Sequence, residues 1–154
     1  MSKILKIRAR QVFDSRGNPT IEAEVYSKNL SASAICPSGA STGTYEAFEK
    51  RDKKDKKYLG KSVLSAVNLV NTKISKKLSG TNIHDQIRID TTLINLDGTR
   101  QKINLGANAI LAVSMAAKKL SAKIKNIPLL LWWDFLCCQK LDELLSLKFY
   151  SFIF

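Results

Sequence analysis

The sequence has few of the residues that mark disulfide-stabilised, metal-binding or membrane-spanning chains. It contains 3 cysteines, of which Cys137 and Cys138 are adjacent, and a single histidine, His84. An odd number of cysteines with an adjacent pair does not suit a disulfide scaffold and is typical of a reducing cytoplasm. No apolar run reaches the ~20 residues that a membrane-spanning helix needs, and Met1–Arg10 lacks the apolar core of a signal peptide. We therefore expect a soluble, cytoplasmic protein without a membrane span.

Acidic residues are also scarce: the sequence has 13 acidic and 25 basic residues, which gives a net charge of +12. The densest basic run, EKRDKKDKKYLGK (49–61), is interrupted by Asp52 and Asp55, carries one aromatic residue and matches no nucleic-acid-binding motif. We interpret it as a solvated loop and expect no specific nucleic-acid partner. With 154 residues, 45% of them apolar, the chain is long enough for one domain with a hydrophobic core.

Three strands are predicted in the first 36 residues. Residues 5–9 alternate, which places Leu5, Ile7 and Ala9 on one side of a half-buried strand. After the turn DSRGNP, residues 21–26 alternate in the same way, and LSASAI (30–35) follows the polar break SKN. The short connections predict a three-stranded antiparallel meander.

Three helices follow, at residues 63–78, 85–96 and 106–126. The first is predicted by apolar residues spaced three and four apart and ends before Gly80, and Asp85 is a suitable N-cap for the second. Strands followed by a helical bundle indicate an α+β fold. The third helix has one alanine-lined surface, which we interpret as adapted to a neighbour that this chain does not contain: Ala107, Ala109, Ala112, Ala116 and Ala117.

Between the strands and the helices lies the stretch CPSGASTGTYEAFEKRD, which begins at Cys36. Its small residues leave the backbone many conformations, so that an ordered position requires a ligand or partner. These residues form a candidate loop over a binding site: Ser38, Gly39, Ala40, Ser41, Thr42 and Gly43. Cys36 itself is interpreted as a small buried apolar residue, because no histidine or helix start lies near it in the sequence.

Three segments read together, DSRGNPTIEAEV, PSGASTGTYEAFEKRD and NLDGTRQKINLGANAILAVSMA, closely resemble the enolase (phosphopyruvate hydratase) family in order and spacing. KYLGKSVLSAVNLVN and the NIP at 126–128 fit the same family, so the resemblance extends from about Ile4 to Leu129. It implies a magnesium-dependent carbon-oxygen lyase of glycolysis that dehydrates 2-phospho-D-glycerate to phosphoenolpyruvate. The implied fold is the family's α+β N-terminal domain (1–129), and the α/β barrel that follows it in the family is absent.

The resemblance also assigns roles to single residues. Ser41 matches the family's lid serine, which binds the second Mg²⁺ through its hydroxyl and carbonyl oxygens once substrate is present. Glu22 matches a contact of the enolase homodimer, although the alternation of Glu22 and Glu24 by itself indicates the solvated face of a strand. His84 does not match the histidines of the family's barrel. No catalytic residue is assigned, because the family's catalytic lysine, glutamate and metal carboxylates project from the barrel, and we expect this chain alone to be inactive.

Residues 130–154 depart from the family. No alanine follows Ala122, and Trp132–Asp134 must be encoded TGG TGG GAY, which read one base later gives the Gly-Gly pair that the family has at this point. We therefore hypothesise an out-of-frame translation. The alternative is a genuine tail with one apolar helical stripe, which would make the chain a non-catalytic basic domain whose aromatic tail docks a partner or an anionic surface.

Overall fold

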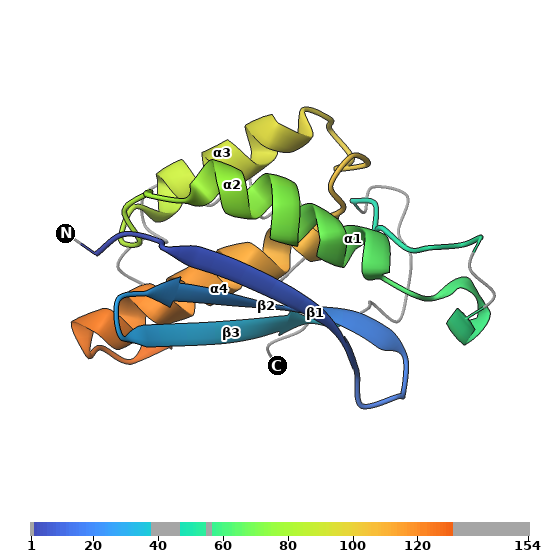
Figure 1. The fold of residues 1–154 in the computed structure, drawn as a ribbon, viewed down its shortest axis with the longest axis horizontal. Coiled ribbons are helices and arrows are strands. Elements are labelled where there is room, and N and C mark those ends of the chain that lie inside the picture. The colour runs from blue at the N-terminus through green and yellow to red at the C-terminus, as the bar shows by residue number, and fades with distance from the viewer. Residues whose placement is uncertain (1, 38–46, 55–56, 131–154) are drawn as a thin grey trace.

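The computed structural model describes residues 2–37, 47–54 and 57–130, and begins with a three-stranded antiparallel sheet (Figure 1). The strands are β1 (Lys6–Phe13), β2 (Pro19–Ser27) and β3 (Leu30–Cys36), in the order β1-β2-β3. Alternate residues of β2 are buried as the pattern predicts, because successive side chains point to opposite faces of a sheet. Ile21, Ala23 and Val25 are all inaccessible to solvent. The predicted meander is confirmed.

The first strand differs from its prediction at both ends. Leu5 lies before β1 and is 58% exposed, because Ile4 occupies the buried position and its backbone N–H donates to Thr81. β1 continues to Phe13 although the apolar alternation has stopped, since the ladder to β2 runs on to the pair Phe13 and Pro19. The placement of Leu5 on the buried side was therefore wrong.

The first predicted helix is one helical run of three parts: α1 (Leu64–Leu69), a π-helical turn η2 (Val70–Ile74) and α2 (Ser75–Leu78). A short 3₁₀ segment, η1 (Lys57–Gly60), precedes it. The predicted apolar stripe is buried except for Val67, which is partly buried; its fully buried residues are Val63, Ala66, Val70, Ile74 and Leu78. At the π turn the Asn71 side chain pairs with the backbone of Ala9 in β1, as Oδ1 accepts from N (2.7 Å) and Nδ2 donates to O (3.1 Å).

The remaining helices are α3 (Gln86–Asp97) and α4 (Ala107–Lys125). As predicted, Asp85 caps α3, with Oδ1 accepting from the N–H of Arg88 at 3.0 Å. α4 packs on β2 and β3, the helical run α1 to α2 lies against β1, and α3 lies on α4 (Figure 1). The confirmed architecture is thus α+β, with the helices on one face of the sheet.

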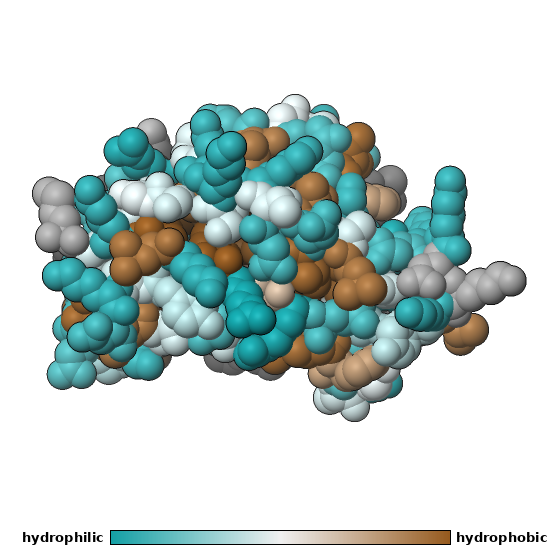
Figure 2. All heavy atoms as spheres, viewed as in Figure 1, coloured by the Kyte–Doolittle hydropathy of each residue, from teal (hydrophilic) through white to brown (hydrophobic). Residues whose placement is uncertain are grey.

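The alanine-lined surface of α4 is covered within this chain. Ala109, Ala112, Ala116 and Ala117 are inaccessible to solvent, because small side chains let α4 approach β2 and β3 closely. The interpretation that this surface lacks its neighbour was therefore wrong. Figure 2 shows hydrophilic atoms over most of one face, with apolar atoms mainly between the helices and the strands. Within the described ranges, no helix has the length and apolar character to cross a bilayer.

Candidate functional site

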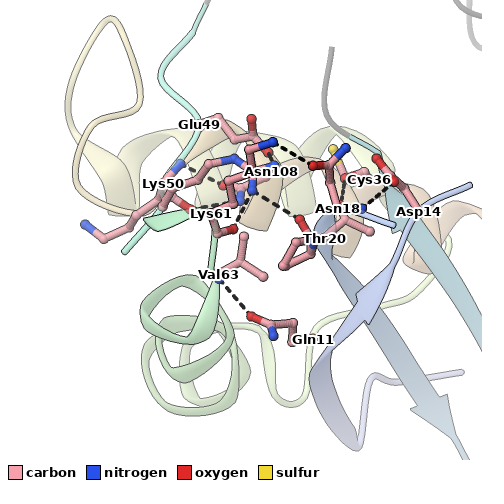
Figure 3. Close-up of polar contacts among 12 residues, drawn as sticks. Gln11, Asp14, Asn18, Thr20, Cys36, Glu49, Lys50, Lys61, Val63 and Asn108 are labelled. Carbon is pink, nitrogen blue, oxygen red and sulfur yellow. Dashed lines mark hydrogen bonds and ion pairs between the residues drawn. The ribbon is translucent and has the colours of Figure 1, made fainter. Parts of the chain in front are cut away.

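The candidate loop residues Ser38 to Gly43, including Ser41, lie outside the described residues. The structure describes the two flanks of segment 38–46. The first flank is the end of β3 at Cys36, and the second flank is the chain from Ala47 to Asp52. Figure 3 shows several of the polar contacts that hold the two flanks.

The first flank is fixed by β2. Cys36 pairs with Ile21 in the antiparallel ladder, and the Thr20 hydroxyl donates a short hydrogen bond to the Cys36 carbonyl oxygen (Figure 3). Thr20 is 1% exposed and Cys36 7%, so this contact is shielded from water. Because a buried hydroxyl without a partner is destabilising, the pairing holds the end of β3 to the start of β2.

The second flank lies along the chain that enters α4. The Phe48 N–H donates to the Gln101 carbonyl (2.7 Å), and the Phe48 carbonyl accepts from the Ala107 N–H (2.8 Å). Two residues later, the Lys50 N–H donates to Asn108 Oδ1 and the Lys50 carbonyl accepts from Asn108 Nδ2, both at 3.1 Å (Figure 3). The backbone from Phe48 to Lys50 is therefore paired on one side much as a strand is.

Arg51 joins the second flank to the sheet. Its Nη1 donates to the carbonyls of Pro19 (3.1 Å) and Lys61 (2.5 Å), and its Nη2 binds Glu49 Oε1 at 2.8 Å. The planar guanidinium suits this arrangement because its donors diverge in a fixed fork. Pro19 and Thr20, neighbours at the start of β2, thus hold the two flanks of segment 38–46.

The turn between β1 and β2 supports the same region. Asp14 Oδ1 accepts from the N–H groups of Arg16 (2.9 Å) and Asn18 (2.8 Å), while the Asn18 side chain accepts from Lys61 Nζ at 2.9 Å. The Asn18 hydrogen bond is the main cause that lowers the pKa of Asp14. On the other side of the turn, Gln11 Oε1 accepts from the Val63 N–H at 2.9 Å (Figure 3).

Cys36 is a buried apolar residue, as predicted. Burial, and secondarily the Glu49 carboxylate, raises the pKa of its thiol to about 12. The thiolate is the nucleophile in cysteine chemistry, so Cys36 is unsuited to nucleophilic catalysis.

This burial gives a measurable prediction. In a Cys137→Ser/Cys138→Ser background, the native chain should react with iodoacetamide at pH 8 on the order of 10³-fold more slowly than the unfolded chain, because an unperturbed thiol has a pKa near ~8.5. The measurement is the alkylation rate with and without guanidinium. Similar rates in both conditions would contradict the burial of Cys36.

Glu22 is not simply solvated, contrary to the interpretation from alternation. It lies opposite Arg10 in the ladder, and Arg10 Nε donates to Glu22 Oε2 at 2.5 Å. The carboxylate side chain is only 12% exposed, and the hydrogen bond from Arg10 is the main cause that lowers its pKa. Glu24 is likewise occupied, since it accepts from the hydroxyls of Tyr26 (2.6 Å) and Ser31 (2.9 Å). On this face of the sheet, the polar side chains therefore form hydrogen bonds with one another.

Other candidate groups lie apart from the two flanks. His84 Nδ1 is 2.8 Å from the Ser121 hydroxyl, and burial is the main cause that lowers its pKa. Over residues 2–37, 47–54 and 57–130, no three His, Cys, Asp or Glu side chains gather in a way that would hold a metal ion.

Sequence reasoning missed Asn108 and Arg51. Asn108 stood inside a helical pattern and Arg51 inside a basic run, and the backbone groups that they bind are 58 and up to 32 residues away. The only signal was their position within the two segments GANAILAVSMA and TYEAFEKRD.

Comparison with known proteins places the chain. The family described as "Enolase, N-terminal domain" matches residues 4–132. The protein named "Enolase" from Pelagibacter ubique (strain HTCC1062) is 91% identical over 129 residues, which cover 84% of this chain and 31% of that protein. The chain thus spans about a third of the length of this curated relative.

Proposed function

Because the chain belongs to the enolase family through its N-terminal domain, we propose that it serves the dehydration of 2-phospho-D-glycerate to phosphoenolpyruvate. The observation that carries this proposal is the 91% identity over 129 residues, which include both flanks of segment 38–46. In this proposal the domain works together with an α/β barrel and a second subunit. The 154-residue chain alone does not catalyse the reaction, since none of its residues matches the family's general base, general acid or metal carboxylates.

The chemistry explains this division of labour. Removing a weakly acidic proton next to a carboxylate requires a tuned base and a positive charge that stabilises the enediolate. Bound Mg²⁺ supplies that charge in the family, and we propose Ser41 as a ligand of the second ion. The other ligands come from outside the described residues. We also propose that Glu22 lies at a homodimer contact, where a basic residue of the partner would compete with Arg10 for its carboxylate.

A chimera tests the proposed activity. Residues 1–129 of this chain replace the matching part of the Pelagibacter ubique enolase, and phosphoenolpyruvate formation is followed by its ultraviolet absorbance. We expect the chimera to reach within ~10-fold of the relative's kcat, because 91% identity preserves the packing of the domain. Ser41→Ala should lower kcat/KM about 100-fold, as expected when a group near the reacting atoms is lost.

Two controls accompany this experiment. Ser75→Ala, at the start of α2, should leave kcat/KM unchanged, and the 154-residue chain should show no activity. A folded chimera without activity, beside an active relative, would overturn the proposal. It would favour the alternative, a non-catalytic basic domain, which predicts salt-dependent polyanion binding that is lost on deleting residues 130–154.

A further inference from the structure

The side chain of Asn108 makes all its observed hydrogen bonds outside its own helix. It is the second residue of α4, is 3% exposed, and pairs through Oδ1 and Nδ2 with the N–H and carbonyl of Lys50 (Figure 3). An amide side chain has both a donor and an acceptor, so it satisfies both backbone groups of one residue at once. An apolar side chain in its place would leave both Lys50 groups without their partners.

The backbone at Gly106, two residues before Asn108, also lies very close to Lys50. At Gly106 an added Cβ would lie 2.5 Å from Lys50 Cβ and 2.6 Å from Asn108 Oδ1. The Lys50 side chain is also held, since its Nζ donates to the Asn104 carbonyl at 2.9 Å. Lys50 is therefore fixed through its backbone and its side chain, against a chain that approaches it closely only because residue 106 is glycine.

This contact sets where the second flank starts. Phe48, two residues before Lys50, is paired with Gln101 and Ala107, and Ala47 is the first described residue after segment 38–46. Arg51, one residue after Lys50, binds the Pro19 carbonyl next to Thr20, which holds Cys36. The ends of the segment that carries Ser41 are thus tied to α4 and β2.

We propose that Asn108 is a positioning residue for the dehydration reaction: its amide fixes Lys50 and thereby the end of the segment that carries Ser41. This inference rests on the proposed function. It assigns a role in the reaction to a buried residue that acts through its contact with Lys50. Misplacing a group by about 1 Å lowers rates by up to ~10²-fold, so loss of the amide should act on kcat more than on KM.

Asn71 provides a matched control. Its amide makes the same two-bond contact, to the backbone of Ala9 at the edge strand β1, but Asn71 is exposed whereas Asn108 is buried. In the active chimera, Asn108→Asp keeps the acceptor and loses the donor, and Asn71→Asp does the same at the control position. Each variant removes one hydrogen bond and adds a carboxylate beside a carbonyl, and Asn108→Asp should lower the Tm more than Asn71→Asp, because its carboxylate is buried.

The two variants should differ in activity and in local exchange. We expect Asn108→Asp to lower kcat about 10- to 100-fold with KM changed less than ~3-fold, and Asn71→Asp to leave kcat within ~2-fold. Independently of activity, hydrogen exchange of the Lys50 amide should accelerate about 10-fold or more in Asn108→Ala, which removes the acceptor of the Lys50 N–H, and should stay unchanged in Asn71→Ala. If Asn108→Asp or Asn71→Asp fails to fold, Asn108→Ala and Asn71→Ala take their places.

The outcomes separate the two proposals. An inactive chimera with the unchanged domain would overturn the proposed function together with this inference. An active chimera in which the Asn108 and Asn71 variants lose kcat equally, or in which exchange at Lys50 does not change, would overturn the positioning role alone.

Discussion

Replacing Gly106 with alanine is expected to lower the free energy of unfolding of the 154-residue chain by about 2 to 6 kcal/mol. Gly106 has φ +93° and ψ 135°, a backbone conformation outside the left-handed helical region, where a side chain costs about 1 to 3 kcal/mol. The added methyl group would also meet Lys50 Cβ at 2.5 Å and the Lys50 backbone nitrogen at 3.1 Å. Because a backbone atom cannot move aside as a flexible side chain does, the second flank must shift, which costs about 1 to 3 kcal/mol more.

Gly80→Ala separates these two contributions. Gly80 has a similar positive φ of +83°, but an added Cβ would meet nothing within 4 Å. This control should lose about 1 to 2 kcal/mol, from the backbone conformation alone. The measurement is urea unfolding of both variants and the unchanged chain. Equal losses for the two variants would show that the second flank does not press on Gly106.

The architecture could be predicted from the sequence because its signals are local. Alternation in β2 predicts one apolar face, and so does the three-four spacing from Val63 to Leu78. In each of these two elements the predicted face lies against the core. The extent of β1 could not be predicted, because its last residues are held by the ladder to β2 rather than by apolar alternation. The neighbour of the α4 alanines was missed for a related reason, since α4 packs on strands far away in the sequence.

The candidate site was likewise predicted only in part. The loop around Ser41 was predicted from its small residues and the role of Ser41 from family resemblance, and both predictions lie outside the described residues. Cys36 was correctly predicted to be buried. The residues that hold the two flanks were not found, because hydrogen bonds between Asn108 and Lys50 or Arg51 and Pro19 exist only after the chain has folded. The periodicity of apolar residues predicts which face of a helix or strand a residue lies on. It carries no information on which distant backbone group a side chain binds.

Replacing Asp97 with alanine should lower the free energy of unfolding at pH 7 by about 3 kcal/mol. Asp97 is 2% exposed at the end of α3, where Oδ2 accepts from the buried Leu105 N–H at 2.7 Å. Oδ1 accepts from the Thr99 N–H (3.0 Å) and from the Thr99 hydroxyl. Losing a charged acceptor leaves these donors without partners, and each such bond is worth about 1.5 to 3 kcal/mol, less than additively.

The opposite end of the same helix supplies the control. Asp85 caps the first turn of α3 through one hydrogen bond to the Arg88 N–H, and Asp85→Ala should cost about 1 kcal/mol. Urea unfolding of both variants at pH 7 measures the difference. A loss at Asp97 no greater than that at Asp85 would mean that the carboxylate does not organise the chain between Asp97 and Leu105.

The Asp97 contribution should also depend on pH in one direction. Burial acts to raise the pKa of Asp97, but the hydrogen bonds from Leu105 and Thr99 outweigh it and lower the pKa. A carboxyl whose pKa is lower in the folded state stabilises the fold above its unfolded pKa of ~3.9, and this stabilisation is lost as the pH falls through the folded value. The stability gap between the unchanged chain and Asp97→Asn should therefore be largest above pH ~5 and shrink below pH ~4. A gap that widened in acid would mean that the buried carboxyl is held in its neutral form, and that Leu105 and Thr99 bind it too weakly to offset its burial.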